Sequence, residues 1–324
     1  MASDLPSGDP ALLNRIAWAR RWNDRKASLS YALEARKKAL DGQGRRSRAE
    51  QGFALRTLGW HALWRGDLKL AMDYCLRAET YLPESDFAHV RAGIYSLIGK
   101  VHYNRNRFDL AICSIERGLW LVQDSEDDPA TLADLMLSQT AIQRRTGERA
   151  RAGITLGRAR SLATGDNAAL VDICTTYLLL DDRDTVQALE YARTAVTYCE
   201  EAGNEVILPF ARAALAACLT ARGNHLDAYE QIKTGLAALD DNNHWAQCLL
   251  LRCLADHHLG KGEQSKALEI LKKAATIADA HAFKLMHKNI ALIHADTLEE
   301  TGEYKAALDQ HKLAWRLQNE TRLR

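Results

Sequence analysis

Proline is scarce in this 324-residue chain, at five residues, and alternation of β-branched with polar residues is almost absent. Proline ends helices and period-two alternation is typical of strands, so both scarcities favour a helical protein. No segment approaches the roughly 18 uninterrupted apolar residues that a membrane helix requires. The opening residues MASDLPSGDP lack the basic stretch and apolar core of a signal peptide. We therefore expect a cytoplasmic protein with no membrane partner.

The chain also lacks an excess of charge of either sign. Its 43 Lys and Arg residues face 42 Asp and Glu residues, a formal net charge of +1. Near-neutrality removes the global argument for binding nucleic acid or an anionic membrane. The first 65 residues are locally basic, and we interpret their Gln43–Arg48 stretch as a flexible, solvated loop. Nucleic acid is the weaker alternative there, because no series of stacking aromatic residues accompanies the loop.

Motifs of catalysis and of cofactor binding are missing as well. The sequence contains no GxxxxGK[ST] loop, no GxGxxG after a strand, no HExxH and no GxSxG. The Gly260–Glu263 segment lacks the spacing of a phosphate loop, and we expect a hairpin turn. The acidic residues from Asp124 to Asp128 lack the alternating ligands and the glycine of an EF-hand. We therefore predict no enzymatic activity and no cofactor.

Cysteines and histidines offer no complete set of metal ligands. The seven cysteines contain no CxxC pair and lie in apolar helical patterns, which predicts small buried residues in a reducing compartment. Seven of the eleven histidines lie between residues 244 and 311. His287 and His294 share a helical face and could converge with His257 or His258 on a metal. We expect no bound metal, and a metal-dependent enzyme at this end is the least favoured alternative.

What the chain does contain is apolar residues at three- and four-residue spacing, divided into repeated helical hairpins. Small residues let the two helices of a hairpin approach closely, glycine permits the tight turn, and proline ends the second helix. The clearest unit contains Leu58, Gly59, Ala62, Gly66, Ala71, Cys75, Ala78 and Pro83. These offsets resemble the tetratricopeptide (TPR) repeat consensus, with Ala62 and Cys75 in place of a tyrosine and the second aromatic residue.

The small residue at Ala71 recurs along the whole chain, at Ala111, Ala152, Ala188, Ala228, Ala267 and Ala307, with Ala27 expected as the first member. The spacing near 40 exceeds the ~34 residues usual for TPR units. We predict one all-α, right-handed superhelical solenoid over residues 1–324, with eight TPR-like hairpins centred near residues 25, 66, 106, 147, 183, 223, 262 and 302. Asp181 to Asp184 replace the glycine turn of the fifth hairpin, where we expect a local irregularity.

The resemblance implies a protein- or peptide-binding scaffold in which the first helix of each hairpin lines a concave groove. By the repeat register, the groove positions are Phe53, Arg56, Trp60, Leu63, Trp64, Ser96, Lys100, Tyr103, Asn104, Asp134, Leu137, Arg144 and Arg145. The predicted partner-binding residues are Arg56, Trp60, Trp64, Lys100, Tyr103, Asn104, Arg144 and Arg145. Among them, the main contacts are expected from Arg56, Trp60, Lys100, Tyr103 and Arg144. Arginine and aromatic residues often dominate binding energy, so the predicted partner carries an acidic segment beside an apolar anchor.

Two alternatives stay open at the groove. Trp60 and Trp64 lie four residues apart on one helical stripe, so they could instead pack against the first hairpin. Lys100, Asn104 and Arg144 are the residue types of the carboxylate clamp in chaperone-binding TPR proteins, but they do not have its spacing.

The long repeats also resemble the regulatory regions of bacterial signalling proteins such as GGDEF diguanylate cyclases. The last helix, expected over about residues 304–324, carries no clear stop signal and would lead into an output domain. The sequence has no GGDEF motif, so this alternative describes an N-terminal sensor module of a larger protein. The partner and the oligomeric state are left open by the sequence.

Overall fold

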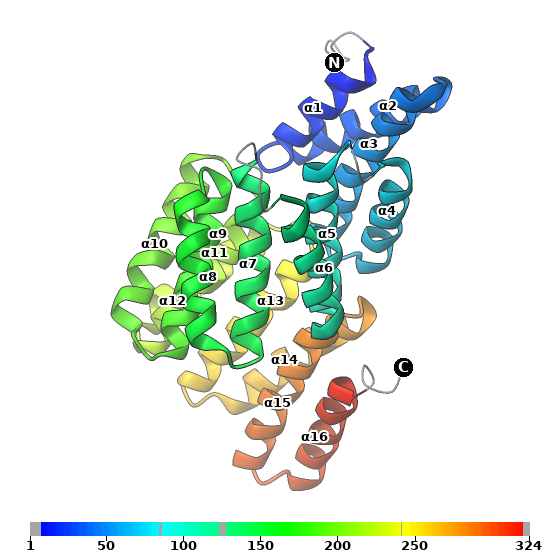
Figure 1. The fold of residues 1–324 in the computed structure, drawn as a ribbon. Helices are drawn as coiled ribbons and strands as arrows, with labels where there is room; N and C mark the ends of the chain where they lie inside the picture. The colour runs from blue at the N-terminus through cyan, green and yellow to red at the C-terminus, as the bar shows by residue number, and fades with distance from the viewer. Residues whose placement is uncertain (1–7, 84–85, 123–127, 241, 320–324) are drawn as a thin grey trace.

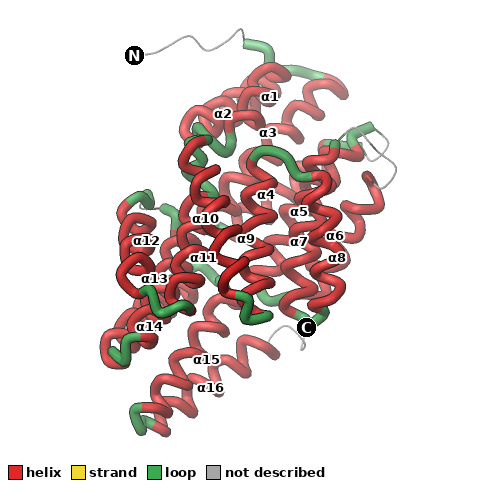
Figure 2. Tube along the Cα trace, turned by 90° about the vertical axis from the view of Figure 1, so that its left-hand side faces the viewer, coloured by secondary structure: helices red, strands yellow, loops and turns green. Residues whose placement is uncertain are grey.

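The computed structural model describes residues 8–83, 86–122, 128–240 and 242–319, and within these ranges it contains sixteen α-helices and no strand (Figure 1; Figure 2). In chain order the helices are α1 (Pro10–Arg20), α2 (Arg25–Asp41), α3 (Gly44–Arg65), α4 (Leu68–Tyr81), α5 (Ala88–Asn104), α6 (Phe108–Val122), α7 (Pro129–Arg145), α8 (Arg149–Leu162), α9 (Asp166–Asp181), α10 (Thr185–Glu201), α11 (Leu208–Ala221), α12 (His225–Ala237), α13 (His244–Gly260), α14 (Gln264–Ala280), α15 (Lys284–Glu300) and α16 (Tyr304–Asn319). Among the described residues, no helix is long and apolar enough to span a membrane.

The helices pair into eight hairpins, α1 with α2 through α15 with α16, and each predicted centre lies in or beside the turn between the two helices. The helical-solenoid prediction is therefore confirmed. In seven hairpins the same turn position has a positive φ angle. Glycine occupies it five times, as in Gly66 at φ 91°, while Asn106 and Arg183 adopt φ 59° and 62°. The irregularity expected in the fifth hairpin is thus confined to Arg183, because Asp184 caps α10 by accepting from the Gln187 N–H.

Close helix contact follows the predicted small residues. Ala71 and its six equivalents from Ala111 to Ala307 are all buried. Opposite Ala71, a Cβ atom on Gly59 would lie 3.0 Å from the Cys75 sulfur, so any larger residue would push α3 and α4 apart. Ala27 is not the first member of the series, because it is only half-buried. Ser28 takes that position, and its hydroxyl donates to the Ala17 carbonyl across the first hairpin at 2.6 Å.

The stack has an inner and an outer layer. Successive odd-numbered helices from α1 to α13 contact one another, whereas successive even-numbered helices do so at most marginally. The odd-numbered helices therefore form the inner face of the superhelix, as the TPR resemblance implied. The curvature also brings distant hairpins together, since α13 contacts α3 and α15 contacts α5. The six helices α3, α5, α7, α9, α11 and α13 thus form a closed ring.

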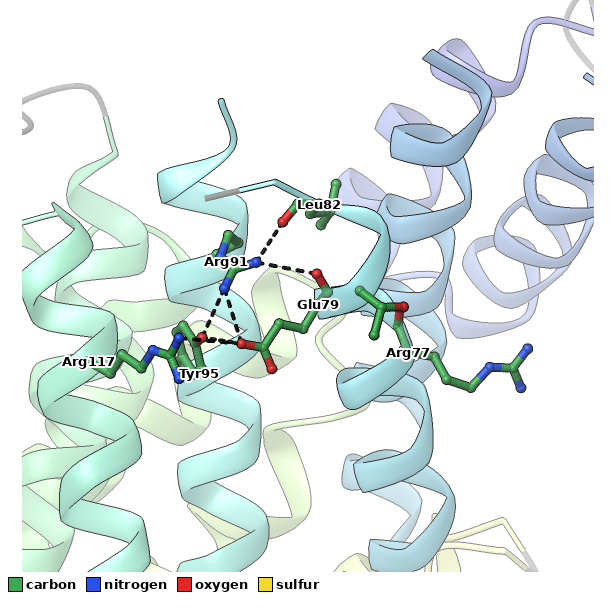
Figure 3. Close-up of polar contacts among 7 residues, drawn as sticks. Arg77, Glu79, Leu82, Arg91, Tyr95 and Arg117 are labelled. Atoms are coloured by element: carbon green, nitrogen blue, oxygen red, sulfur yellow. Dashed lines mark hydrogen bonds and ion pairs between the residues drawn. The ribbon is translucent and has the colours of Figure 1, made fainter. Parts of the chain in front are cut away.

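Polar contacts fix the angle between the second and third hairpins (Figure 3). Arg91 on α5 is buried, and it donates to the Leu82 carbonyl at 2.6 Å and to the Glu79 carboxylate at 3.1 Å. The Tyr95 hydroxyl donates to the same carboxylate. Arg117 on α6 approaches Glu79 at 3.8 Å. Because these residues satisfy the C-terminal end of α4, we interpret them as structural.

Two further predictions are corrected by the structure. The Gln43–Arg48 stretch is not a loop, because α3 begins at Gly44 and the Ser47 hydroxyl donates back to the Ala39 carbonyl. Five cysteines are buried as predicted, but Cys174 is half-buried and Cys113 is exposed on α6. Asp128 serves as the N-cap of α7, accepting from the Thr131 N–H, while residues 124–127 of the acidic segment lie outside the described residues. The Gly260–Glu263 segment is a hairpin turn, as expected.

Candidate functional site

The inner face carries ion pairs that join neighbouring hairpins. The Lys100 ammonium on α5 lies 2.5 Å from a carboxylate oxygen of Asp134 on α7. Ser96, one turn before Lys100, donates to the same carboxylate at 2.6 Å. Burial raises the pKa of Asp134, but the charge and hydrogen bonds of Lys100 and Ser96 outweigh it, and the pKa lies below its ordinary value. Lys100 is therefore committed to a carboxylate of the chain itself.

A similar ion pair joins α7 to α9, the next two inner helices of the superhelix. The Arg144 guanidinium on α7 donates to both carboxylate oxygens of Asp181 on α9, at 2.5 and 2.8 Å. Burial lowers the pKa of Arg144, yet the hydrogen bond and charge of Asp181 raise it above its ordinary value. A bidentate pair of this kind holds both side chains in one orientation. Beside it, the exposed Arg145 donates to the Tyr103 hydroxyl at 3.4 Å, which brings two predicted site residues together.

Tyr177 on α9 lies between these two ion pairs and helix α13, which is on the opposite side of the ring. The Arg144 guanidinium carbon is 5.3 Å from the centre of its ring. Burial raises the pKa of the phenol, so the group is a neutral hydroxyl near pH 7. The hydroxyl oxygen is enclosed and has no hydrogen-bond partner among the described residues. On α13, Arg252 pairs with Asp256 at 2.6 Å and interacts electrostatically with Tyr177.

Trp60 and Trp64 are not exposed groove contacts, because both are buried. They belong to an aromatic cluster that consists of Trp22, Trp60, Trp64, Phe210 and Trp245. Ring centroids in it lie 4.8 Å apart for Trp22 and Trp60, and 5.4 Å apart for Trp64 and Phe210. The alternative of packing on the first hairpin is confirmed through Trp22. The cluster also extends to α11 and α13, because the closed ring brings those helices against α3.

Other predicted groove positions are buried as well. Asn104 is buried, and its side-chain amide donates to the Lys100 carbonyl at 2.9 Å. The remaining buried positions are Leu63, Ser96 and Leu137. Half-buried or exposed members are Phe53, Arg56, Lys100, Tyr103, Asp134, Arg144 and Arg145. Arg56 has no carboxylate partner among the described residues, and it stacks on Trp18.

These contacts change the charge that the sequence predicted for the inner face. Lys100 and Arg144 are neutralised by Asp134 and Asp181, so the inner face alternates in sign instead of being basic. A charge-reversing substitution at Lys100 is therefore not neutral for stability. A glutamate there would face the Asp134 carboxylate.

The histidine-rich end does not bring together the residues considered for a metal. His287 is 3.6 Å from Asp279, whereas the His257 ring packs near His225 and His258. His244 and His281 stack with centroids 3.9 Å apart. In the described part of the chain, no group of three or more His, Cys, Asp or Glu residues has the arrangement of a metal site.

Sequence reasoning missed Tyr177, Asp181 and Arg252. The repeat register carried the signal, because Tyr177 stands six residues before Arg183 just as Lys100 stands six before Asn106. Arg252 likewise precedes Gly262 by the ten residues that separate Arg56 from Gly66. Applying the register beyond the fourth hairpin would have identified Tyr177 and Arg252 as residues of the inner face.

No family model matches this chain, and no curated protein matches its sequence. Solved structures match it at low identity. The Rap conjugation gene regulator of plasmid pLS20, in complex with the Phr* peptide, is 12% identical with a TM-score of 0.70, over 97% of this chain and 95% of that one. A Rap protein complexed with competence and sporulation factor is 13% identical with a TM-score of 0.69, over 98% and 99%. Yeast Tom70 is 13% identical with a TM-score of 0.51, over 96% and 66%. The chain therefore has the fold of TPR-like helical repeat proteins.

Proposed function

We propose that the chain is a protein- or peptide-binding scaffold that binds its partner on the inner face of the superhelix. The Tyr177 hydroxyl carries this proposal, because it is buried there without a partner among the described residues. Buried polar groups are almost always hydrogen-bonded, so this enclosed hydroxyl beside fixed charges has a donor and an acceptor free for a water or a ligand on the inner face. A peptide offers backbone donors and acceptors to such a group, and its side chains would lie against the Lys100, Arg144 and Arg252 ion pairs.

The similar solved structures support the proposal because two of them are complexes with a bound factor or peptide. One contains a Rap protein with competence and sporulation factor, and another contains a Rap regulator with the Phr* peptide. Both superpose over nearly all of this chain. The proposed partner keeps an acidic segment beside an apolar anchor, with the acidic part directed to Arg145 and Arg56, since Lys100 and Arg144 are already paired.

A regulatory role fits the same scaffold. The pLS20 Rap protein is described as a gene regulator, so we propose a cytoplasmic signalling adaptor without catalytic activity of its own. A sensor module attached to an output domain, as in GGDEF cyclases, is the more specific form of this proposal. Sequencing the reading frame beyond Arg324 tests it, and a following stop codon would refute it.

A peptide-display selection tests the binding proposal. Peptides selected on the wild-type protein are measured by fluorescence anisotropy against the double variant Tyr103→Ala with Arg145→Gln. Arg145 is exposed, whereas Tyr103 is half-buried and packs near Phe108, so a thermal melt of the variant must show that folding is retained. We expect at least a tenfold loss of affinity, because both contacts are removed.

The matched control removes the same residue types from outer helices. Tyr304 on α16 and Arg193 on α10 are both exposed, and the variant Tyr304→Ala with Arg193→Gln should bind within twofold of wild type. A selection that yields no saturable binder, or binders that respond only to the outer-surface variant, would contradict the proposal.

A further inference from the structure

Two arginines on the inner side of the first hairpins share one indole ring. The guanidinium carbon of Arg56 lies 3.6 Å from the centre of the Trp18 ring, and that of Arg21 lies 3.9 Å from it. The two guanidinium carbons are therefore no farther apart than the sum of these two distances. Arg21 also lies 5.2 Å from the Trp22 ring. Their positions in the sequence do not pair these arginines, since Arg21 precedes α2 and Arg56 lies within α3.

Among the described residues, neither arginine has a carboxylate within ion-pair distance, the partner that a buried guanidinium normally requires. Arg21 donates one hydrogen bond, to the Trp18 carbonyl at 2.6 Å. Arg56 makes no hydrogen bond or ion pair within the described ranges, and the Nε–H groups of both residues are enclosed without an acceptor. Asp134 and Asp166 act on the charge of Arg21, and Asp128 acts on both arginines, in each case from beyond ion-pair distance. Burial lowers the pKa of Arg56 to about 9, and the neighbouring Arg21 charge adds to this effect.

The site is nevertheless reachable from solvent. Trp18, Arg21 and Arg56 are each half-buried, so part of each side chain remains accessible although the Nε atoms are covered. The stem of Arg56 lies near α5, where its Cδ would be 3.9 Å from a Cβ on Gly93. A planar guanidinium fixed on an aromatic ring keeps its remaining N–H groups in a set direction.

We propose that Arg21, Trp18 and Arg56 form a binding site for a single oxyanion group, a carboxylate or a phosphate, at the edge of the inner face. The oxyanion accepts from the accessible N–H groups of both arginines and supplies the contacting carboxylate or phosphate that neither arginine has among the described residues. This inference rests on the proposed function only for the origin of the oxyanion, which is an acidic side chain of the partner. The site itself can be tested without the partner.

The probes are inorganic phosphate and succinate, titrated at constant ionic strength by calorimetry and by tryptophan fluorescence, which reports on Trp18. The wild-type protein should bind at least one of them saturably at one site. Binding of both indicates general oxyanion recognition, and preference for one identifies its chemical source. Arg56→Gln and Arg21→Gln should each weaken binding at least tenfold, whereas Arg193→Gln, a neutralised exposed arginine on α10, should change it less than twofold.

Folding is checked separately. Because each arginine lies in the field of the other, removal of one should leave the melting temperature unchanged or raised in the absence of anion. Arg56→Lys, which keeps the charge but loses the planar stack, should bind more weakly than wild type. Absence of saturable binding in folded wild-type protein, or equal binding by Arg56→Gln, would overturn the proposal. Such a result would leave the Tyr103 and Arg145 test of the proposed function unaffected.

Discussion

Substitution of Trp64 by alanine should open the closed ring. Trp64 is buried by rings from three separate parts of the chain, with centroids at 5.4 Å from Trp22, 5.4 Å from Phe210 and 5.7 Å from Trp245. Trp22 belongs to the first hairpin, whereas Phe210 and Trp245 belong to the sixth and seventh. The side chain therefore links hairpins that are far apart along the solenoid.

The expected loss of stability is large. A buried tryptophan replaced by alanine costs about 3–5 kcal/mol, including the cavity that remains. With an unfolding entropy of about 2.1 cal/mol/K per residue and 324 residues, the melting temperature should fall by roughly 4–7 °C if the solenoid unfolds as one unit.

Thermal denaturation and small-angle scattering together form the assay. Leu135→Ala on α7 is the matched control, because Leu135 is fully buried between neighbouring hairpins and its loss costs about 2–5 kcal/mol. We expect both variants to melt earlier, but only Trp64→Ala to increase the radius of gyration. An unchanged radius in Trp64→Ala would show that the cluster adds stability without holding the ring closed.

Four further predictions follow from particular residues. Ala71→Leu or Ala111→Leu should overpack a hairpin by ~1–3 kcal/mol, seen in thermal melts, and an unchanged melting temperature would contradict the packing described above. Lys100→Glu should destabilise by on the order of 2 kcal/mol by facing Asp134, and adding Asp134→Asn should restore much of the loss. Burial lowers the pKa of His61 to about 3 from 6.5, so the unfolded chain binds the extra proton and stability should decline as pH falls below 6.5, by up to about 1.4 kcal/mol per pH unit. His61→Gln should flatten this slope, and His89→Gln, at an exposed site, should not. Mass spectrometry of the native protein should find no stoichiometric zinc, and one equivalent that is lost on changing His287 and His294 would reverse that expectation.

The repeat register predicted much of the fold because hairpin geometry is local. Gly66 and its equivalents mark turns wherever a positive φ angle is needed, and Ala71 and its equivalents mark the contact between two consecutive helices. Even Arg183 could be placed in a turn, although its residue type gave no such indication. The failures at Ala27 and at Gln43 were also local, since a serine can fill an alanine position and a basic stretch can begin a helix.

The candidate site was predicted less well, because its residues obtain their partners from other hairpins. Lys100 and Arg144 were placed on the inner face, yet the sequence could not show that Asp134 and Asp181 neutralise them. A charge pair between successive helices depends on their axial offset and rotation, which the repeat spacing does not specify.

By itself, the sequence determined an all-α chain of eight hairpins, the turn positions and the helices that face inward, because each of these depends on neighbouring residues. Only the tertiary structure decided that α13 meets α3, that Trp60 and Trp64 are enclosed, and that Arg21 and Arg56 share the Trp18 ring. In a solenoid each hairpin contacts its neighbours through a small rotation, and closure depends on the sum of those rotations over the whole stack. No single repeat encodes that sum, so residues distant in sequence become partners only in the folded superhelix.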